Sequence, residues 1–177
     1  MNKGIFAEHA PSYLNAGYEP RPIKPKDKAC KSKGWNKPNS ELPAGTWERW
    51  LEKCPDYGVG LRLGTILVDG SQLCVLDIDD DRYVKAAQFL LGNPPCGRIG
   101  SKGIAYFVRL RGVLGTVRKT FDVPLENGKT LHVGELLGAG SLVVIPPTIH
   151  PSTNRPYSWI GKPLLEVDPH DLPIVEV

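Results

Sequence analysis

The stretch from Leu73 to Asp81 constrains the fold of this chain most, because apolar residues run directly into a cluster of acids. Its first part, Leu73-Cys74-Val75-Leu76, is typical of a buried strand. Side chains alternate between the two faces of a strand, so Asp77 and Asp79 project to one side while Ile78 turns back into the apolar layer. The sequence therefore predicts a buried strand that presents two carboxylates on one face at its carboxyl end.

Two carboxylates this close raise each other's pKa unless a cation neutralises them, and their hard oxygens suit Mg²⁺ or Mn²⁺ better than zinc. The pair Asp77 and Asp79 thus forms half of a divalent-metal site. A solvated acidic turn is the alternative, because Asp80 or Asp81 can cap a helix expected over residues 83–91. The strand alone leaves both interpretations open.

The composition is that of an ordinary globular protein rich in short elements. The chain has 177 residues, enough for a single domain over residues 1–177 with a substantial core. It contains 19 Gly and 17 Pro, which favours many turns over long helices. The net charge of +3 is compatible with nucleic-acid binding but does not indicate it. Whether the protein binds nucleic acid depends on where the charges lie.

The cysteine pattern favours a reduced, cytoplasmic protein. No two of the four cysteines form a Cys-x-x-Cys pair, so a sequence-local zinc site is not expected. Cys74 lies inside the apolar strand, and no signal peptide is recognisable at the start of the sequence. No run is long and apolar enough to span a bilayer, so we expect a soluble protein without a membrane partner.

Hydrophobic periodicity predicts a mixed, loop-rich order of elements. Trp47 and Trp50 are three residues apart, which places both on one face of a short helix, where core packing is favoured. Thr46 is the expected cap of that helix. The remaining expectations are a helix over 5–17, an extended piece over 18–23, a helix over 46–54, strands over 57–64, 104–109, 130–136, 142–145 and 156–160, a turn over 98–103, and a terminal cap from residue 164.

Residues 24–43 form an irregular basic segment that combines six lysines with Pro, Gly and Trp35. Such a composition is unsuited to a packed element. It fits a solvated surface loop, and equally a flexible arm that meets phosphates or stacks a base. In the second case Lys31, Lys33 and Trp35 are the nucleic-acid-binding candidates.

The segment Arg98-Ile99-Gly100-Ser101-Lys102-Gly103 brings two cations, a hydroxyl and open backbone N–H groups together, a combination suited to phosphate. It lacks the spacing of a Walker loop, and a basic hairpin turn is the simpler alternative. Arg109, at the far end of the strand that follows, is equally ambiguous. Arg98, Ser101, Lys102 and Arg109 are therefore candidates for nucleotide binding.

Two later residues complete the set of candidates. The strand expected over 130–136 presents Glu135 beside a glycine-rich turn. Glu135 would add a third carboxylate to the aspartate pair, although by itself it is typical of an ordinary surface glutamate. His150 ends a rigid Pro-rich corner after the apolar strand over 142–145. It either contacts a nucleotide or closes its loop by hydrogen bonding to the backbone.

Taken together, these motifs resemble the primase-polymerase branch of the archaeo-eukaryotic primase superfamily, a type often found on plasmids and phages. Their order and spacing are more specific than any single motif. The matching segments are Gly17 through the basic stretch to Gly34-Trp35, Trp47-x-x-Trp50, residues 57–64, residues 75–79, residues 100–103, Glu135, residues 146–151 and Tyr157-Ser158-Trp159.

The resemblance implies template-directed joining of nucleotides by a two-metal mechanism. It implies that Asp77, Asp79 and Glu135 hold Mg²⁺ or Mn²⁺ and carry catalysis. The middle motif of the family normally has Ser-x-His for the incoming triphosphate, whereas here Ile104-Ala105 stands where the histidine is expected. The triphosphate would then depend on Arg98, Lys102 and Arg109.

The resemblance also implies a fold and partners. We expect an α/β (α+β) domain whose central, largely antiparallel sheet holds the acids and is flanked by helices, with a small N-terminal lobe. The partners would be a single-stranded DNA template, dNTP or NTP, and a helicase domain or protein, since residues 1–177 carry no helicase-like motif. The missing histidine motivates an alternative, a catalytically impaired nucleic-acid-binding replication module that keeps the fold, and a metal-dependent nuclease is a third interpretation.

Overall fold

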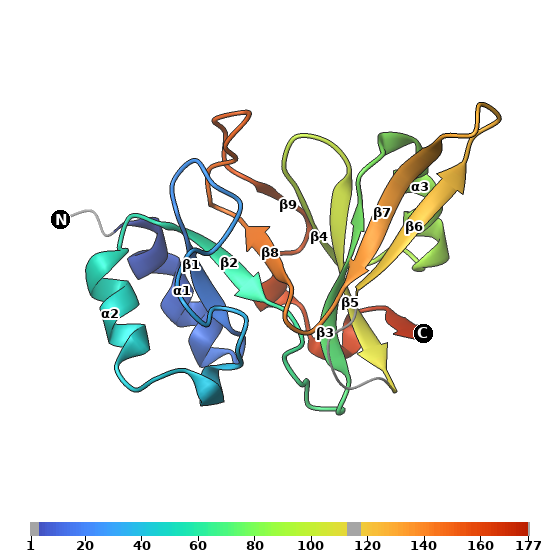
Figure 1. The fold of residues 1–177 in the computed structure, drawn as a ribbon. Coiled ribbons are helices and arrows are strands. Elements are labelled where there is room, and N and C mark those ends of the chain that lie inside the picture. The colour runs from blue at the N-terminus through green and yellow to red at the C-terminus, as the bar shows by residue number, and fades with distance from the viewer. Residues whose placement is uncertain (1–3, 113–117, 177) are drawn as a thin grey trace.

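A computed structural model describes residues 4–112 and 118–176, which form two β-sheets joined side by side with helices on both flanks (Figure 1). The small sheet has the strand order β1-β2-β8. The large sheet has the order β6-β7-β3-β5-β4-β9, and β10 pairs with β5 outside this path. The strands are β1 Pro20–Ile23, β2 Gly58–Arg62, β3 Gln72–Ile78, β4 Cys96–Ile99, β5 Ile104–Arg111, β6 Arg118–Pro124, β7 Thr130–Leu137, β8 Leu142–Ile145, β9 Ser158–Gly161 and β10 Ile174–Glu176.

Every pairing along the main path of both sheets is antiparallel, and only β10 joins β5 in parallel. The strand that carries the acids, β3, lies between β7 and β5 near the middle of the large sheet. The expected α+β class with a central, largely antiparallel sheet is confirmed.

The helices flank the sheets on opposite sides of the molecule. Figure 1 shows α1 (Ile5–Asn15) and α2 (Thr46–Lys53) beside the small sheet and α3 (Asp81–Leu90) against the large one. Helix α1 contacts β1 and β2, and α3 contacts β3. Three short 3₁₀ turns complete the elements, η1 Asn39–Glu41, η2 Leu164–Glu166 and η3 Pro169–Asp171. The small sheet with α1 and α2 is the expected N-terminal lobe, although β8 comes from late in the chain.

The two faces of β3 pack into different cores. Leu73 and Val75 join the main cluster, which also holds Phe107 of β5 and side chains of the N-terminal lobe. On the other face, Cys74 packs beside β5 and β7, and Ile78 packs under α3. Asp77 is on the same face as Leu73 and Val75, so its carboxylate points toward the space between the two sheets.

Several helix ends agree with local sequence signals. Helix α1 ends before Gly17, whose φ of 85° is the left-handed conformation of a helix stop. Asp80 caps α3 by accepting a hydrogen bond from the backbone N–H of Arg82. The cap expected of Thr46 is wrong, because Gly45 is the N-cap of α2 and Thr46 is the first helical residue.

Two further expectations are corrected. Arg98 lies within β4 and not in the turn expected over 98–103, because β4 pairs with both β5 and β9. Strand β6 was not expected from the sequence, since all seven of its residues are exposed and it lacks an apolar run. It pairs with β7 along one edge of the large sheet.

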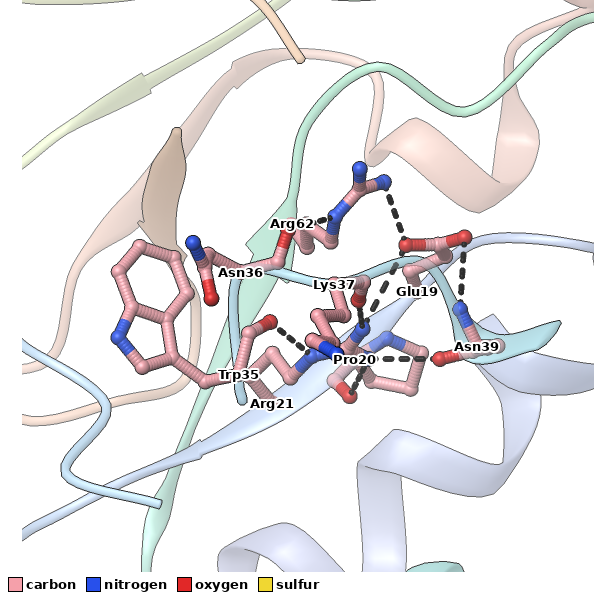
Figure 2. Close-up of polar contacts among 8 residues, drawn as sticks. All are labelled: Glu19, Pro20, Arg21, Trp35, Asn36, Lys37, Asn39 and Arg62. Atoms are coloured by element: carbon pink, nitrogen blue, oxygen red, sulfur yellow. Dashed lines mark hydrogen bonds and ion pairs between the residues drawn. The ribbon is translucent and has the colours of Figure 1, made fainter. Parts of the chain in front are cut away.

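A buried cluster of charged side chains fixes the basic segment 24–43 to the small sheet (Figure 2). Arg21 is fully buried, and it donates from Nε to the carbonyl of Trp35 and from Nη2 to the carbonyl of Lys37, both at 2.7 Å. Arg62 donates from Nε to the carbonyl of Asn36 at 2.7 Å, and Glu19 pairs with both guanidinium groups. The segment is thus anchored at residues 35–37.

Among the helices within residues 4–112 and 118–176, none is both long enough and apolar enough to cross a membrane.

Candidate active site

Asp77 and Glu135 are direct partners in the antiparallel register of β3 and β7. Residues paired in this way point to the same face of a sheet, with their Cβ atoms about 5 Å apart. The same row continues across the sheet through Ala105 of β5 to Arg98 of β4. Asp79 follows β3 and is held at the sheet end because its backbone N–H donates to the carbonyl of Val133 at 2.8 Å.

These side chains line a pocket of about 240 Å³ between the two sheets. The large sheet and the turn after β4 supply the acids and most of the cations. The small sheet supplies Leu142 and Val144, and the basic segment supplies Lys28. The remaining lining residues are Asp77, Asp79, Arg98, Gly100, Ser101, Lys102, Glu135, Leu137, His150 and Tyr157.

Each of the three acids faces a different cationic or titratable side chain. Asp77 Oδ2 lies 3.9 Å from Arg98 Nη2. Asp79 Oδ2 lies 3.3 Å from His132 Nε2, and the other ring nitrogen of His132 lies 2.7 Å from Asp122. Glu135 Oε2 accepts a hydrogen bond from Arg118 Nε at 2.6 Å.

The environment of Asp77 disfavours its charged form. Burial raises the pKa of this carboxyl, and the charges of Asp79 and Glu135 raise it further, whereas Arg98 and Lys28 oppose the shift. A cation bound between the carboxylates would remove this repulsion.

The donor chemistry of the pocket fits a divalent cation, because Asp77, Asp79 and Glu135 offer several hard oxygens at one place. The carboxylates of these three side chains do not converge on one point. Within the described ranges, no three acidic, histidine or cysteine side chains form a ready-made metal cluster. The three carboxylates therefore have to change rotamer to share an ion. The contact between Glu135 and the exposed Arg118 is the least costly one to break.

Beside the acids, the pocket is lined by groups that suit phosphate. Ser101 and Lys102 come from the turn between β4 and β5. The guanidinium of Arg98 lies 5.0 Å from the ring centre of Tyr157, and its Nε is buried with no hydrogen-bond partner among the described residues. A buried donor without a partner is unfavourable, so this group is suited to receive an anionic ligand.

His150 is held in one orientation at the edge of the pocket. It is 2% exposed, and its ring packs on Tyr157 with a centroid distance of 5.0 Å. Its Nδ1 accepts hydrogen bonds from the backbone N–H groups of Ser152 and Thr153 at 3.2 and 3.3 Å. Burial lowers the pKa of the ring, as do Lys28 and Arg98, so the neutral form with the proton on Nε2 is favoured.

The loop closure expected of His150 is present at Nδ1, whereas contact of this ring with a nucleotide stays a prediction. Within the described residues, Nε2 has no hydrogen-bond partner. It is therefore available to donate to a ligand.

Ile104 and Ala105 stand where a histidine was expected, and neither side chain is free to reach the pocket. Ile104 is on the opposite face of β5, where it packs with Ile78 and Ala87 under α3. Ala105 is on the same face as Asp77, but it is completely buried in the main core. His150 is the imidazole that the fold brings to this pocket.

Arg109 does not lie at this pocket. Its side chain is 7% exposed and donates to the carbonyls of Leu172 and His170, and it pairs with Asp69 at 2.6 Å. Nε and Nη2 fix the C-terminal segment to β5, and Nη1 is engaged by Asp69. Arg109 is therefore not available to bind a nucleotide in this pocket.

The structure separates the three residues considered for nucleic-acid binding. Lys31 pairs with Asp27 at 3.4 Å on the surface. Trp35 is partly buried against a cluster that includes Tyr157, and Lys33 lines a different groove. The lysine of this segment that reaches the carboxylate pocket is Lys28, which sequence reasoning did not single out from its neighbours.

The comparison with protein families agrees with this geometry. The sequence model of the family described as bifunctional DNA primase/polymerase, N-terminal (Prim-Pol), matches residues 10–174. The chain belongs to the Prim-Pol family. The matched region of this Prim-Pol domain contains every residue of the carboxylate pocket. A comparison with curated proteins gave no match.

Proposed function

We propose that this Prim-Pol domain is a DNA primase-polymerase that joins nucleotides on a single-stranded template in plasmid or phage replication. The observation that carries the proposal is the shared face of Asp77 and Glu135, which gathers acids beside groups that suit phosphate in one pocket. Family membership supports the same chemistry. A helicase domain or protein stays a predicted partner.

Asp77, Asp79 and Glu135 would hold Mg²⁺ or Mn²⁺. Bound there, the ions would supply charge neutralisation at the attacking 3′ hydroxyl and at the leaving pyrophosphate. The chain's own contribution is to keep these carboxylates on one face of a rigid sheet, where Asp77 is largely shielded from water. Such preorganisation favours electrostatic stabilisation of the reacting phosphoryl group.

The triphosphate of the incoming dNTP or NTP would lie against Arg98, Ser101 and Lys102. Lys28 adds a cation from the N-terminal lobe, and His150 adds a neutral donor at Nε2. Together these groups balance the charge of the triphosphate without the histidine that the middle motif normally carries. This arrangement is the reason to favour an active enzyme over a module that has lost catalysis.

Primer extension with Mn²⁺ tests the proposal. The wild type is expected to add the dNTP complementary to the template, and the Asp77→Asn/Asp79→Asn variant is expected to add none. A Glu8→Gln/Glu126→Gln variant, which removes two exposed carboxylates away from the pocket, is the matched control and should keep full activity. Equal activity of the aspartate variant, or no extension by the wild type, would refute the proposal, and degradation of the template would indicate a nuclease.

A further inference from the structure

A second cavity, of about 550 Å³, lies in the N-terminal lobe between the basic segment and α2. Three cations line it, Lys33 and Lys37 from the segment and Arg49 from α2. Glu41 is the one acid among its lining residues. The apolar part of its surface comes from Leu42, Pro43 and Trp50. A groove with clustered cations beside apolar and aromatic surface matches the chemistry of a nucleic-acid strand.

The wall that carries the two lysines is rigid. Arg21 and Arg62 bind the carbonyl oxygens of Trp35, Asn36 and Lys37, each at 2.7 Å. Figure 2 shows these guanidinium groups gathered around the backbone of the segment, with Glu19 between them. A wall fixed in advance loses little conformational entropy when a ligand binds, which favours affinity.

The opposite wall is fixed as well. Arg49 Nη2 donates to Thr46 Oγ1 at 2.8 Å, one turn earlier in α2. Trp50 is 6% exposed, and the guanidinium of Arg21 covers its ring at 5.3 Å from the centroid. The same buried arginine therefore supports both the lysine wall and the aromatic floor of the groove.

The basic segment connects this groove to the carboxylate pocket. Lys28 lines the pocket, and Ser32, Lys33 and Gly34 line the groove. Ser32 is four positions after Lys28, so their Cα atoms are at most about 14 Å apart. One short stretch of the basic segment thus contributes to both the groove and the pocket.

We propose that this groove binds the phosphate backbone of single-stranded nucleic acid and leads the strand toward the carboxylate pocket. The role as a template path depends on the proposed function, whereas strand binding by the groove stands independently. Lys33, Lys37 and Arg49 contact phosphates, and the apolar floor lies beneath the sugars and bases. The basic segment acts as a preformed binding wall, and its lysines are divided between two cavities.

Fluorescence anisotropy with a labelled single-stranded oligonucleotide in EDTA, measured over a range of salt concentrations, tests the proposal. The variant is Lys33→Ala/Lys37→Ala/Arg49→Ala. The matched control is Lys85→Ala/Lys119→Ala/Lys129→Ala, which removes the same charge from exposed positions on α3 and the β6–β7 hairpin. The groove variant should bind about tenfold or more weakly than the control, and its salt dependence should be flatter by about 2 in the logarithmic slope.

The double variant Lys33→Ala/Lys37→Ala leaves α2 unchanged, so it tests the groove even if the triple variant fails to fold. Its salt slope should change by about two thirds as much as that of the triple variant. Equal affinity and equal salt slope in the groove variants and the control would overturn the proposal.

Mn²⁺-dependent dNTP binding in the same preparations separates this inference from the proposed function. The groove variants should bind dNTP as the wild type does. If the wild type neither binds dNTP nor extends a primer while the groove variants still lose strand binding, the proposed enzyme fails and the groove stands.

Discussion

Asp77 of β3 and Glu135 of β7 lie directly opposite each other in antiparallel register, 58 residues apart in the sequence. Like charges in directly opposed positions destabilise a sheet by roughly 0.2–1 kcal/mol. Arg98 and Arg118 offset part of this repulsion, because each contacts one of the two carboxylates. The pairing is unfavourable for stability, and it suits a site where charged ligands are bound.

Replacing Asp77 by Asn should therefore stabilise the protein in EDTA. The half-buried charge and its repulsion by Asp79 and Glu135 disappear, so we expect the free energy of unfolding to rise by up to about 1 kcal/mol. Urea unfolding of the two proteins measures the difference. Addition of Mn²⁺ should stabilise the wild type and not the variant, because only the folded wild type binds the ion. A variant less stable than the wild type in EDTA would contradict this account of Asp77.

Glu19 should contribute strongly to stability because it compensates two buried arginines. It lies 2.8 Å from Arg62 and 3.5 Å from Arg21, and its own side chain is 13% exposed. Glu19→Ala leaves both guanidinium groups without a carboxylate, which should lower the free energy of unfolding by about 3 kcal/mol. Glu8→Ala, at an exposed position of α1, should change it by less than about 0.5 kcal/mol. Similar unfolding curves for the two variants would show that the cluster is not a stabilising anchor.

The elements that could be predicted from the sequence are those whose signals are local. The apolar run before Asp77 defines β3, Asp80 caps α3 as expected, and β8 has the predicted bounds Leu142–Ile145. These features depend on side-chain periodicity and on hydrogen bonds between near neighbours, which a single sequence displays.

The remaining features depend on long-range pairing. That Glu135 faces Asp77 follows from the register of β7 with β3, which no local pattern encodes; the family resemblance supplied that expectation. Arg109 was an ambiguous candidate for nucleotide binding, yet the C-terminal segment and Asp69 engage its side-chain nitrogens. Likewise, six lysines looked alike in the basic segment, and it is the tertiary structure that brings Lys28 to the pocket.

The pairing of Asp69 with Arg109 should make stability fall in acid. The hydroxyl and backbone N–H of Ser71, together with the guanidinium of Arg109, lower the pKa of Asp69 to about 2. The unfolded chain holds this proton up to a pH of about 3.9, so the stabilisation is complete above that pH and is lost as the pH falls toward 2. The difference in unfolding free energy between wild type and Asp69→Asn should be constant from neutral pH to about pH 5 and then shrink. A difference that stays constant down to pH 2 would contradict the assignment.

His150 should contribute to nucleotide affinity through Nε2 alone. Asn at position 150 keeps an acceptor where Nδ1 receives the N–H groups of Ser152 and Thr153, but it has no donor at the Nε2 position. His150→Asn should therefore weaken dNTP binding about tenfold or more, since a hydrogen bond to a charged ligand contributes about 1.5–3 kcal/mol. His150→Gln, which restores a donor near that position, should recover part of the affinity. Equal dNTP affinity of His150→Asn and wild type, measured by calorimetry with Mn²⁺, would remove His150 from the site.

The most direct test of the account is a titration of Mn²⁺, followed by electron paramagnetic resonance in the presence of a non-hydrolysable dNTP. If Asp77, Asp79 and Glu135 share the ions, Glu135→Gln should weaken Mn²⁺ binding at least about tenfold, because a charged ligand is lost from a small set. Glu126→Gln, an exposed position in the β6–β7 turn, should bind Mn²⁺ as the wild type does. If Glu135→Gln and Glu126→Gln bind Mn²⁺ equally well, the three acids do not form one metal site and the account is wrong.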